Sequence, residues 1–291
     1  MVVKEIISSL RPQQWIKNFF IFAALIFSQN IFTLSLVAKT VVAFVSFCVI
    51  SSALYILNDL KDIEEDKLHP VKSKRPLASG RLKKSHAILS FFILSALAFI
   101  LAVTLNINFL IVTFVYFILQ IAYSFWLKHV VILDVFVIAA GFLIRVVAGG
   151  LAIEVSLSSW LLICTILLAL FLAMGKRRHE LVLLDDGAKD HRPILKEYNP
   201  YFLDQMIAVV TASTVIAYCL YTISPETVEK FGTTNLLYTV PFVLYGIFRY
   251  LYLIHQRHEG GTPETLIIKD KPLLIDIFLW IGTAVLILYL R

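Results

Sequence analysis

Apolar stretches of about 20 residues recur along almost the whole chain, and they constrain the fold more than any other feature. An α-helix needs roughly 20 apolar residues to cross the hydrocarbon core of a bilayer. A mean hydropathy of +0.84, with 59% hydrophobic and only 16% charged residues, is not found in water-soluble domains of this size. We therefore expect the 291 residues to form an all-α, polytopic membrane protein without a separate soluble domain.

Nine apolar stretches are long enough to serve as transmembrane helices. They cover about 16–34, 37–57, 86–105, 108–127, 130–152, 158–175, 203–223, 236–255 and 273–290. The first is the least regular, because Ser28, Gln29 and Asn30 interrupt it. Two polar segments, at about 58–85 and 176–202, separate groups of spans. The sequence thus predicts one integral-membrane domain over residues 1–291, with these two segments as its catalytic loops.

The distribution of basic residues predicts the orientation of the spans. With nine spans, one side of the membrane receives the N-terminus, both polar segments and the short segments near 128 and at 256–272. That side holds 21 of the 26 lysines and arginines, whereas the other has only Lys39, Lys230 and Arg291. Basic loops are retained preferentially in the cytoplasm. We therefore expect a multi-pass protein of the cell membrane with its N-terminus and both catalytic loops in the cytoplasm.

Charge and cysteine content argue against two other kinds of site. The net charge of +6 is explained by basic residues that flank the spans, so nucleic acid is not an expected partner. Cys48, Cys164 and Cys219 each lie in an apolar stretch, with no second cysteine or histidine at metal-binding spacing. We expect them to be packing residues rather than members of a disulfide or a zinc site.

An acidic motif follows the second predicted span. Asn58, Asp62 and Asp66 recur every four residues, and Asp59 lies beside the first of them. If the helix continues past the membrane surface, these three share one face, with Tyr55 one turn below. Oxygen ligands gathered in this way suit Mg²⁺, which a few carboxylates hold and which phosphate and water complete. The alternative is a solvated acidic helix end without a metal. That alternative is disfavoured, because like charges four residues apart on a helix repel each other.

A proline-containing basic loop comes directly after the acidic motif. It includes Lys72, Lys74, Arg75 and Arg81. Taken alone, the loop would be an ordinary cytoplasmic segment of a membrane protein. Beside a metal-binding acidic motif, however, its cations would neutralise the part of a polyphosphate's negative charge that the metal does not neutralise. Its position therefore favours a polyphosphate site.

The second polar segment carries a similar mixture of charges. Lys176 and Glu180 lie one helical turn apart, and Asp186 and Asp190 repeat that interval just after Asp185. One interpretation is a second phosphate or metal clamp that faces the first site. The other is a flexible loop with compensating charges. We favour the clamp for Lys176 and Glu180 over the aspartates, for which a second metal is left open.

Charged residues also lie at or within the membrane between the two polar segments. Lys128 emerges at the cytoplasmic boundary, while Asp134 and Arg145 occupy the fifth predicted span. At ~1.5 Å per residue these two lie ~16 Å apart along the helix and cannot pair. Charges at membrane depth are costly and usually functional. We therefore expect Arg145 to meet a phosphate of a bound ligand, the alternative being a buried arginine satisfied by helix carbonyls.

These residues resemble the UbiA superfamily of intramembrane prenyltransferases. The resemblance rests on the N-D-x-x-D-x-x-x-D motif, the R-P-L-A-S-G-R loop at 75–81, the R-P-Q-Q-W-I-K-N stretch at 11–18 and the nine-span layout. It covers essentially the whole chain. It implies a nine-helix bundle with a central cavity that opens to the cytoplasm, holds magnesium pyrophosphate at its mouth and receives a long isoprenoid chain from the lipid.

Departures from the usual pattern point to one branch of that superfamily. The segment after the sixth span begins G-K-R-R-H-E-L at 175–181 where the typical member has D-x-x-x-D, and Tyr123 to Lys128 is one residue longer than the common Y-x-x-x-K. With L-I-R-V-V-A-G-G at 143–150, these variants are similar to the decaprenyl-phosphate phosphoribosyltransferase branch. The similarity implies transfer of 5-phosphoribose from phosphoribosyl pyrophosphate to a polyprenyl phosphate lipid, with release of pyrophosphate.

The resemblance also implies roles for individual residues. Asp62, with Asp59 and Asp66, is expected to be catalytic, and Asn58, Asp62 and Asp66 to be the Mg²⁺ ligands beside the leaving pyrophosphate. The expected substrate-binding residues are Lys17, Tyr55, Lys72, Lys128, Arg145, Lys176 and Glu180. The acceptor phosphate is already an anion at neutral pH. Positioning and electrostatics should therefore supply most of the rate without a strong general base.

Two other functions stay open at this point. A UbiA-type aromatic prenyltransferase of quinone or haem biosynthesis would use a polyprenyl diphosphate donor, and an assay of the two donors would separate it from the first interpretation. A transporter is the alternative from another class. It would be expected to show inverted repeats and acidic residues near the bilayer midplane, whereas the carboxylates of this chain gather at one membrane face.

Overall fold

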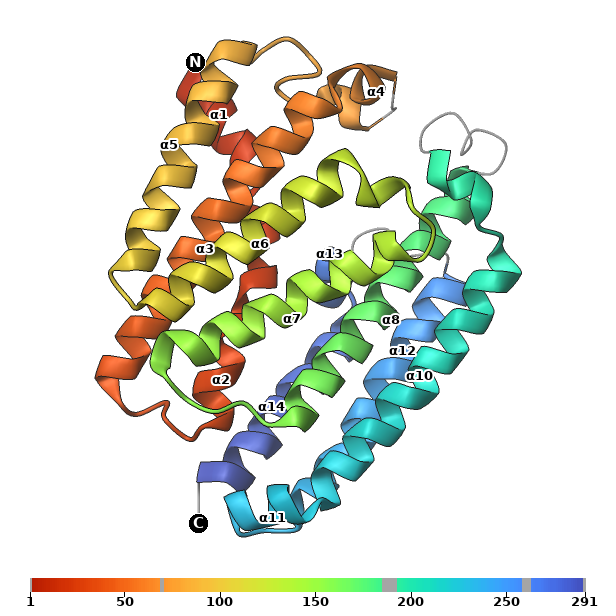
Figure 1. Ribbon diagram of the computed structural model, residues 1–291. Coiled ribbons are helices and arrows are strands. Elements are labelled where there is room, and N and C mark those ends of the chain that lie inside the picture. The colour runs from red at the N-terminus through yellow and green to blue at the C-terminus, as the bar shows by residue number, and fades with distance from the viewer. Residues whose placement is uncertain (1, 69–70, 185–192, 258–262, 290–291) are drawn as a thin grey trace. The chain divides into compact units, whose positions relative to one another are not determined.

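The computed structural model describes residues 2–68, 71–184, 193–257 and 263–289, and the regular elements in these ranges are all helices (Figure 1). Eight of the helices described are long and apolar enough to cross a membrane. They are α3 (Leu34–Lys61), α5 (Lys84–Val103), α6 (Ile107–Phe125), α7 (Leu133–Ile153), α8 (Ser159–Leu184), α10 (Pro200–Ile223), α12 (Val240–Gln256) together with the 3₁₀-helix η6 (Asn235–Thr239) that precedes it, and α14 (Lys271–Tyr289). The expected all-α membrane fold is thus confirmed.

The first predicted span is not a long α-helix. It begins as the 3₁₀-helix η1 (Pro12–Ile21), continues as the short helix α2 (Phe22–Phe27) and ends before Ser28. A 3₁₀-helix rises about 2.0 Å per residue, so η1 and α2 together extend roughly 29 Å, close to the thickness of the hydrocarbon core. This segment explains why eight long helices are found where nine were expected. The count of nine spans stays a prediction.

The chain divides into two compact units, Met1–Leu157 and Ser158–Arg291. In the first unit, α3 packs along α5 and also contacts α6 and α7, while the N-terminal helix α1 (Val2–Leu10) lies against α3. In the second unit, α8 packs along α10, and α12 packs along α14. The expectation of a single domain over residues 1–291 stays a prediction.

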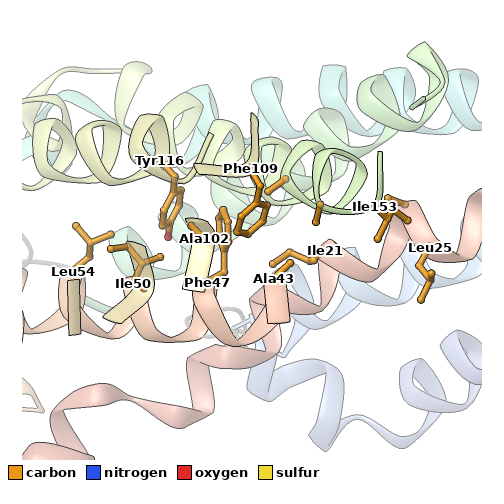
Figure 2. Packing of buried hydrophobic residues seen from close by; sticks show 14 residues of the cluster. Ile21, Leu25, Ala43, Phe47, Ile50, Leu54, Ala102, Phe109, Tyr116 and Ile153 are labelled. Carbon is orange, nitrogen blue, oxygen red and sulfur yellow. The ribbon is translucent and has the colours of Figure 1, made fainter. Parts of the chain in front are cut away.

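Helices α3 and α7 form the interior of the first unit. Their apolar windows are 61% buried, whereas those of α5 and α6 are only 22% buried. The core contains Phe47 from α3, whose ring meets that of Phe109 edge-on and that of Tyr116 at a tilt, both from α6, with Ile21 and Ile153 nearby (Figure 2). Because lipid is as apolar as these side chains, they stabilise the unit through close van der Waals packing between the helices. The outer faces of α5 and α6 are left apolar, as contact with lipid requires.

A glycine allows η1 to approach α7 closely. A Cβ atom added at Gly149 of α7 would collide with the carbonyl oxygen of Ile21 at the end of η1. This approach also holds Asn18 of η1, which is completely buried, beside Arg145 of α7. The glycine therefore fixes the relation between the N-terminal segment and the centre of the unit.

Within the polar segment at 58–85, the described residues 58–68 and 71–85 are folded rather than open. Helix α3 continues to Lys61, α4 (Ile63–Leu68) begins after the single residue Asp62, and the 3₁₀-helix η2 (Lys72–Lys74) follows. A small hydrophobic cluster ties this segment to α3 and α5; it comprises Ile56, Ile63, Leu77, Leu82 and Ala87. We call the segment the cap of the first unit. It positions the charged residues described next.

Candidate active site

Three aspartates at the junction of α3 and α4 form an acidic cluster, defined as Asp59, Asp62 and Asp66. Asp59 is 2% exposed and Asp66 3% exposed, while Asp62 is the C-cap of α3 and is half-buried. Removing a carboxylate from water costs several kcal/mol unless a cation or metal compensates it. The cluster therefore depends on the positive groups around it.

Arg75 of the cap joins two of the carboxylates. Its Nη1 atom lies 3.0 Å from Oδ1 of Asp59 and 2.6 Å from Oδ2 of Asp66. Arg11, which directly precedes η1, binds the same oxygen of Asp59. The Arg11 guanidinium also lies over the ring of Tyr55, 5.0 Å from its centroid. Two arginines from distant segments thus neutralise the buried side of the cluster.

Asp62 has a separate set of partners. Lys128, in the 3₁₀-helix η3 (Leu127–His129), places its Nζ atom 2.6 Å from Oδ1 of Asp62 and is only 7% exposed. The Nδ2 atom of Asn58 donates a hydrogen bond to Oδ2 of Asp62 over 3.0 Å. Lys128 is therefore held at the acidic cluster, and its role as a substrate-binding residue stays a prediction.

The structure distributes the expected metal ligands over two groups instead of one helix face. Asn58 lies with Asp62, whereas Asp66 lies with Asp59 across Arg75. Seven residues are about two helical turns, so Asp59 and Asp66 come to the same side. Asp62 leaves the helical conformation, with φ −98° and ψ 17°, between α3 and α4. This geometry differs from the predicted single face, while the metal role of these residues stays a prediction.

The donor atoms of this site fit Mg²⁺ by their chemistry. The acidic cluster and the Asn58 side chain supply only oxygen ligands, which Mg²⁺ prefers. Among the described residues, no group of three histidine, cysteine, aspartate or glutamate side chains is arranged to hold a metal ion. The carboxylates instead contact a basic set, defined as Arg11, Arg75 and Lys128. A metal would bind carboxylates that these cations already contact.

Lys17 and Lys72 belong to elements that border the cluster. Lys17 lies in η1, which Arg11 precedes, and Lys72 begins η2, whose C-cap is Arg75. Both side chains are half-buried. Arg11 and Arg75, which flank these two elements, bind the acidic cluster. The roles of Lys17 and Lys72 as substrate ligands stay predictions.

Arg145 is the centre of a buried hydrogen-bond network in the first unit. It is 5% exposed and donates over 2.7 Å from Nε to Asn18 Oδ1, from Nη1 to the Gly141 carbonyl oxygen and from Nη2 to the Tyr116 hydroxyl. Its guanidinium also lies 4.9 Å from the centroid of the Tyr116 ring and 5.6 Å from that of Phe142. All its hydrogen-bond partners among the described residues are neutral. The expected phosphate contact stays a prediction.

The second unit contains the other expected substrate-binding residues. Lys176 and Glu180 lie one turn apart on α8, and Glu180 accepts a hydrogen bond of 2.6 Å from Nη1 of Arg177, which is 3% exposed. Arg178 of the same helix binds Asp204 of α10, which also contacts His255 of α12. Charged side chains thus join the ends of three helices. Asp185, Asp186 and Asp190 lie outside the described residues.

Four residues of the site were outside the expected set of metal and substrate ligands: Arg11, Arg75, Asn18 and Tyr116. Of these, Arg75 was predicted only as one of the cations of the basic loop. Arg11 and Asn18 are the first and last residues of the R-P-Q-Q-W-I-K-N stretch, and Arg75 begins the R-P-L-A-S-G-R loop. These motifs could have identified three of the four. Tyr116 lies inside an apolar run of α6 and carries no such signal.

Comparison with known proteins gives consistent results. The profile of the UbiA prenyltransferase family matches residues 18–282. A decaprenyl-phosphate phosphoribosyltransferase of Mycolicibacterium smegmatis is 33% identical over 97% of this chain and 92% of its own length. A protein of the same name from Corynebacterium glutamicum is 32% identical over 98% of this chain and 86% of its own length.

Solved structures show the same fold. A UbiA homologue from Archaeoglobus fulgidus, determined with GPP and Mg²⁺, superposes with a TM-score of 0.73 at 19% identity, over 98% of this chain and 99% of that one. This likeness concerns the fold alone, because the sequence identity is low. It agrees with the helical architecture described above.

Proposed function

Because this chain belongs to the UbiA prenyltransferase family and is therefore a transferase of the membrane, we propose that it transfers 5-phosphoribose from phosphoribosyl pyrophosphate to a polyprenyl phosphate. The bond between the anomeric carbon and pyrophosphate breaks, and a bond from that carbon to an oxygen of the lipid phosphate forms. Pyrophosphate leaves with the electron pair. The lipid is thus the acceptor and the water-soluble sugar phosphate is the donor.

One observation carries this proposal. Relatives that are 32–33% identical over nearly their whole length are named decaprenyl-phosphate phosphoribosyltransferase. The charged site in the first unit supports it, because a polyphosphate leaving group needs many cations and the basic set supplies three. The same site suits a donor that carries both a pyrophosphate and a 5-phosphate.

The acidic cluster and Asn58 would hold Mg²⁺, which when bound stabilises the negative charge that develops on the leaving pyrophosphate. Arg11, Arg75 and Lys128 would bind the phosphates of the donor and hold them in a fixed orientation. The lipid phosphate is already an anion at neutral pH, so no side chain has to remove a proton from it. Orientation and charge stabilisation would then supply most of the rate.

Each remaining predicted ligand is assigned to one of the two substrates. Lys17, Tyr55 and Lys72 belong to elements that border the acidic cluster and would bind donor phosphates there. Arg145 makes three hydrogen bonds with five N–H groups available. Its charge would attract the lipid phosphate. Lys176 and Glu180 would act on the water-soluble donor.

The charge distribution supports a cytoplasmic entrance to the proposed site. The cap at 58–85 and the segment at 176–202 both belong to the side that receives 21 of the 26 lysines and arginines under a nine-span arrangement. We therefore place the N-terminus and both segments in the cytoplasm, where a sugar pyrophosphate is available, and the protein in the cell membrane.

A donor assay tests the proposed reaction. Purified protein is incubated with Mg²⁺, ³²P-labelled phosphoribosyl pyrophosphate and decaprenyl phosphate, and the lipid phase is analysed for label. A parallel reaction contains a polyprenyl diphosphate and hydroxybenzoate. Labelled lipid only in the first reaction is the expected result. Prenylated hydroxybenzoate without labelled lipid would replace the proposal with an aromatic prenyltransferase.

A further inference from the structure

The acidic cluster and the basic set carry three charges of each sign. Arg75 lies within 3.0 Å of both Asp59 and Asp66, and Lys128 lies 2.6 Å from Asp62. Asp59 and Asp66 are at most 3% exposed. A buried carboxylate that loses its cation without gaining another is strongly disfavoured. Any ligand that enters must therefore give these groups new partners.

A metal ion or a pyrophosphate alone satisfies only half of this requirement. Mg²⁺ would bind carboxylates that Arg75 and Lys128 already neutralise, and any cation that it displaced would lack an anion. Pyrophosphate would meet cations whose charge the aspartates already neutralise. The nearby carboxylates would also repel it. When both ligands enter, each group that loses a partner gains one.

Arg75 and Lys128 are the members of the basic set best suited to change partners. Arg75 uses a single nitrogen, Nη1, for both carboxylates, and its other two nitrogens make no hydrogen bond to the described residues. Its side chain is 25% exposed. Lys128 is a single charge on a flexible stem. Arg11, by contrast, has a left-handed backbone, with φ 52°, and lies on the Tyr55 ring.

We propose that Arg75 and Lys128 act as exchange residues, which bind the acidic cluster in the absence of ligand and bind pyrophosphate once a metal occupies the carboxylates. This inference rests on the proposed function, because it takes magnesium and pyrophosphate as the ligands. It implies that the two ligands bind cooperatively, and that the coupling is reciprocal.

If these residues exchange partners, one substitution should raise the affinity for the metal and lower the affinity for pyrophosphate. Arg75→Gln and Lys128→Gln each remove a cation that competes with the metal, so Mn²⁺ alone should bind ~10-fold or more tightly than it does to the wild type. The same variants should bind pyrophosphate more weakly. An arginine or lysine that only binds phosphate would leave the affinity for Mn²⁺ unchanged, and one that only supports the fold would lower both affinities.

Two binding measurements on the full-length protein in detergent test this prediction. Calorimetry gives the affinity for Mn²⁺ without pyrophosphate, and equilibrium dialysis gives the binding of ³²P-pyrophosphate with and without Mg²⁺. Lys83→Gln is the matched control, because Lys83 is an exposed cation of the same cap. This substitution removes the same charge as Arg75→Gln and Lys128→Gln. It should leave the affinity for Mn²⁺ unchanged. The wild type should bind pyrophosphate at least ~10-fold more tightly with Mg²⁺.

The results separate failure of the inference from failure of the proposed function. If both variants bind Mn²⁺ no more tightly than the wild type, while the wild type still needs Mg²⁺ for pyrophosphate, the exchange is overturned and the site is not. If the wild type binds no pyrophosphate with Mg²⁺ present, the metal-pyrophosphate site itself is wrong. Should Arg75→Gln fail to fold, Lys128→Gln decides alone, because Lys128 contacts a different carboxylate.

Discussion

Lys128 lies 66 positions after Asp62 in the chain, yet its ammonium nitrogen is 2.6 Å from an oxygen of that carboxylate. The contact joins η3 to the end of α3. Since the Lys128 side chain is 8% exposed and that of Asp62 is 15% exposed, solvent screens this pair only weakly. The acidic motif is therefore coupled to a lysine that sequence spacing alone does not connect with it.

Asp62→Asn should reduce Mg²⁺-dependent turnover by ~100-fold or more, because it removes the charge that would hold the metal beside the leaving group. The amide keeps the size of the side chain, so membrane insertion should be unchanged. Initial rates across a Mg²⁺ titration check this, with Glu64→Gln as the control, since Glu64 is exposed and pairs with Lys67. Near-normal turnover of Asp62→Asn at limiting Mg²⁺ would refute the metal role. Asn58→Ala should have a smaller effect, because it removes a neutral ligand.

Arg145→Lys should lower the unfolding temperature of the purified protein by several degrees. A lysine ammonium keeps the charge but cannot reach the three acceptors that the guanidinium serves on η1, α6 and α7. Hydrogen bonds from charged groups contribute about 1.5–3 kcal/mol each. Thermal unfolding in detergent measures the effect. Tyr116→Phe deletes one of these bonds and should cause a smaller shift; an equal or larger shift would contradict the explanation.

Gly149→Ala should destabilise the protein and displace η1, because the added methyl group would overlap the carbonyl oxygen of Ile21. The comparison variant is Gly282→Ala on α14, where an added Cβ meets nothing within 4 Å. Alanine favours an open helical position by roughly 0.5–1 kcal/mol. Unfolding temperatures of the two variants should therefore move in opposite directions. Equal shifts of the unfolding temperature would show that η1 and α7 leave room for a methyl group at Gly149.

The pH dependence of stability should reveal the ion pair between Asp270 and Arg249. The hydrogen bond from Arg249 holds the pKa of Asp270 below its ordinary value. A depressed pKa in the folded state gives stability that is present above the unfolded pKa, near 3.9, and that is lost as the pH falls through the folded value. The stability difference between wild type and Asp270→Asn should therefore shrink below about pH 4. A constant difference would show that the charge contributes nothing.

Much of the fold could be predicted from the sequence because bilayer thickness fixes the length of apolar helices. Eight of the nine expected spans correspond to long helices of the described residues. The first did not, because hydropathy reports apolar composition and not whether hydrogen bonds follow the α or the 3₁₀ pattern. The interruption at Ser28 was a visible sign of irregular backbone in the sequence, whereas the left-handed backbone of Arg11 is known only from the structure.

The sequence predicted which residue types form the site, but not which side chains pair with one another. The spacing of Asn58, Asp62 and Asp66 indicated a cluster of oxygen ligands, because helical periodicity is a local property. The pairing of each aspartate depends on contacts with other segments, from Arg75, nine residues after Asp66, to Lys128, 66 residues after Asp62. Sequence spacing carries no information on those contacts. For Arg145, the cost of a buried charge showed that partners must exist, but only the structure identifies them as Asn18, Gly141 and Tyr116.

The hydrophobic cluster beneath the cap affects how tightly a substrate can be held. Fixing the backbone of one residue costs roughly 1–2 kcal/mol of conformational entropy, and a loop that becomes ordered only on binding subtracts this cost from the affinity. Leu77 and Leu82 are 5% and 3% exposed against Ile56 and Ile63, so the segment around Arg75 is ordered by its own packing. Under the proposed function, the interaction energy of the donor polyphosphate with this segment would then contribute to affinity and to orientation of the reacting bond, because no loop has to fold on binding.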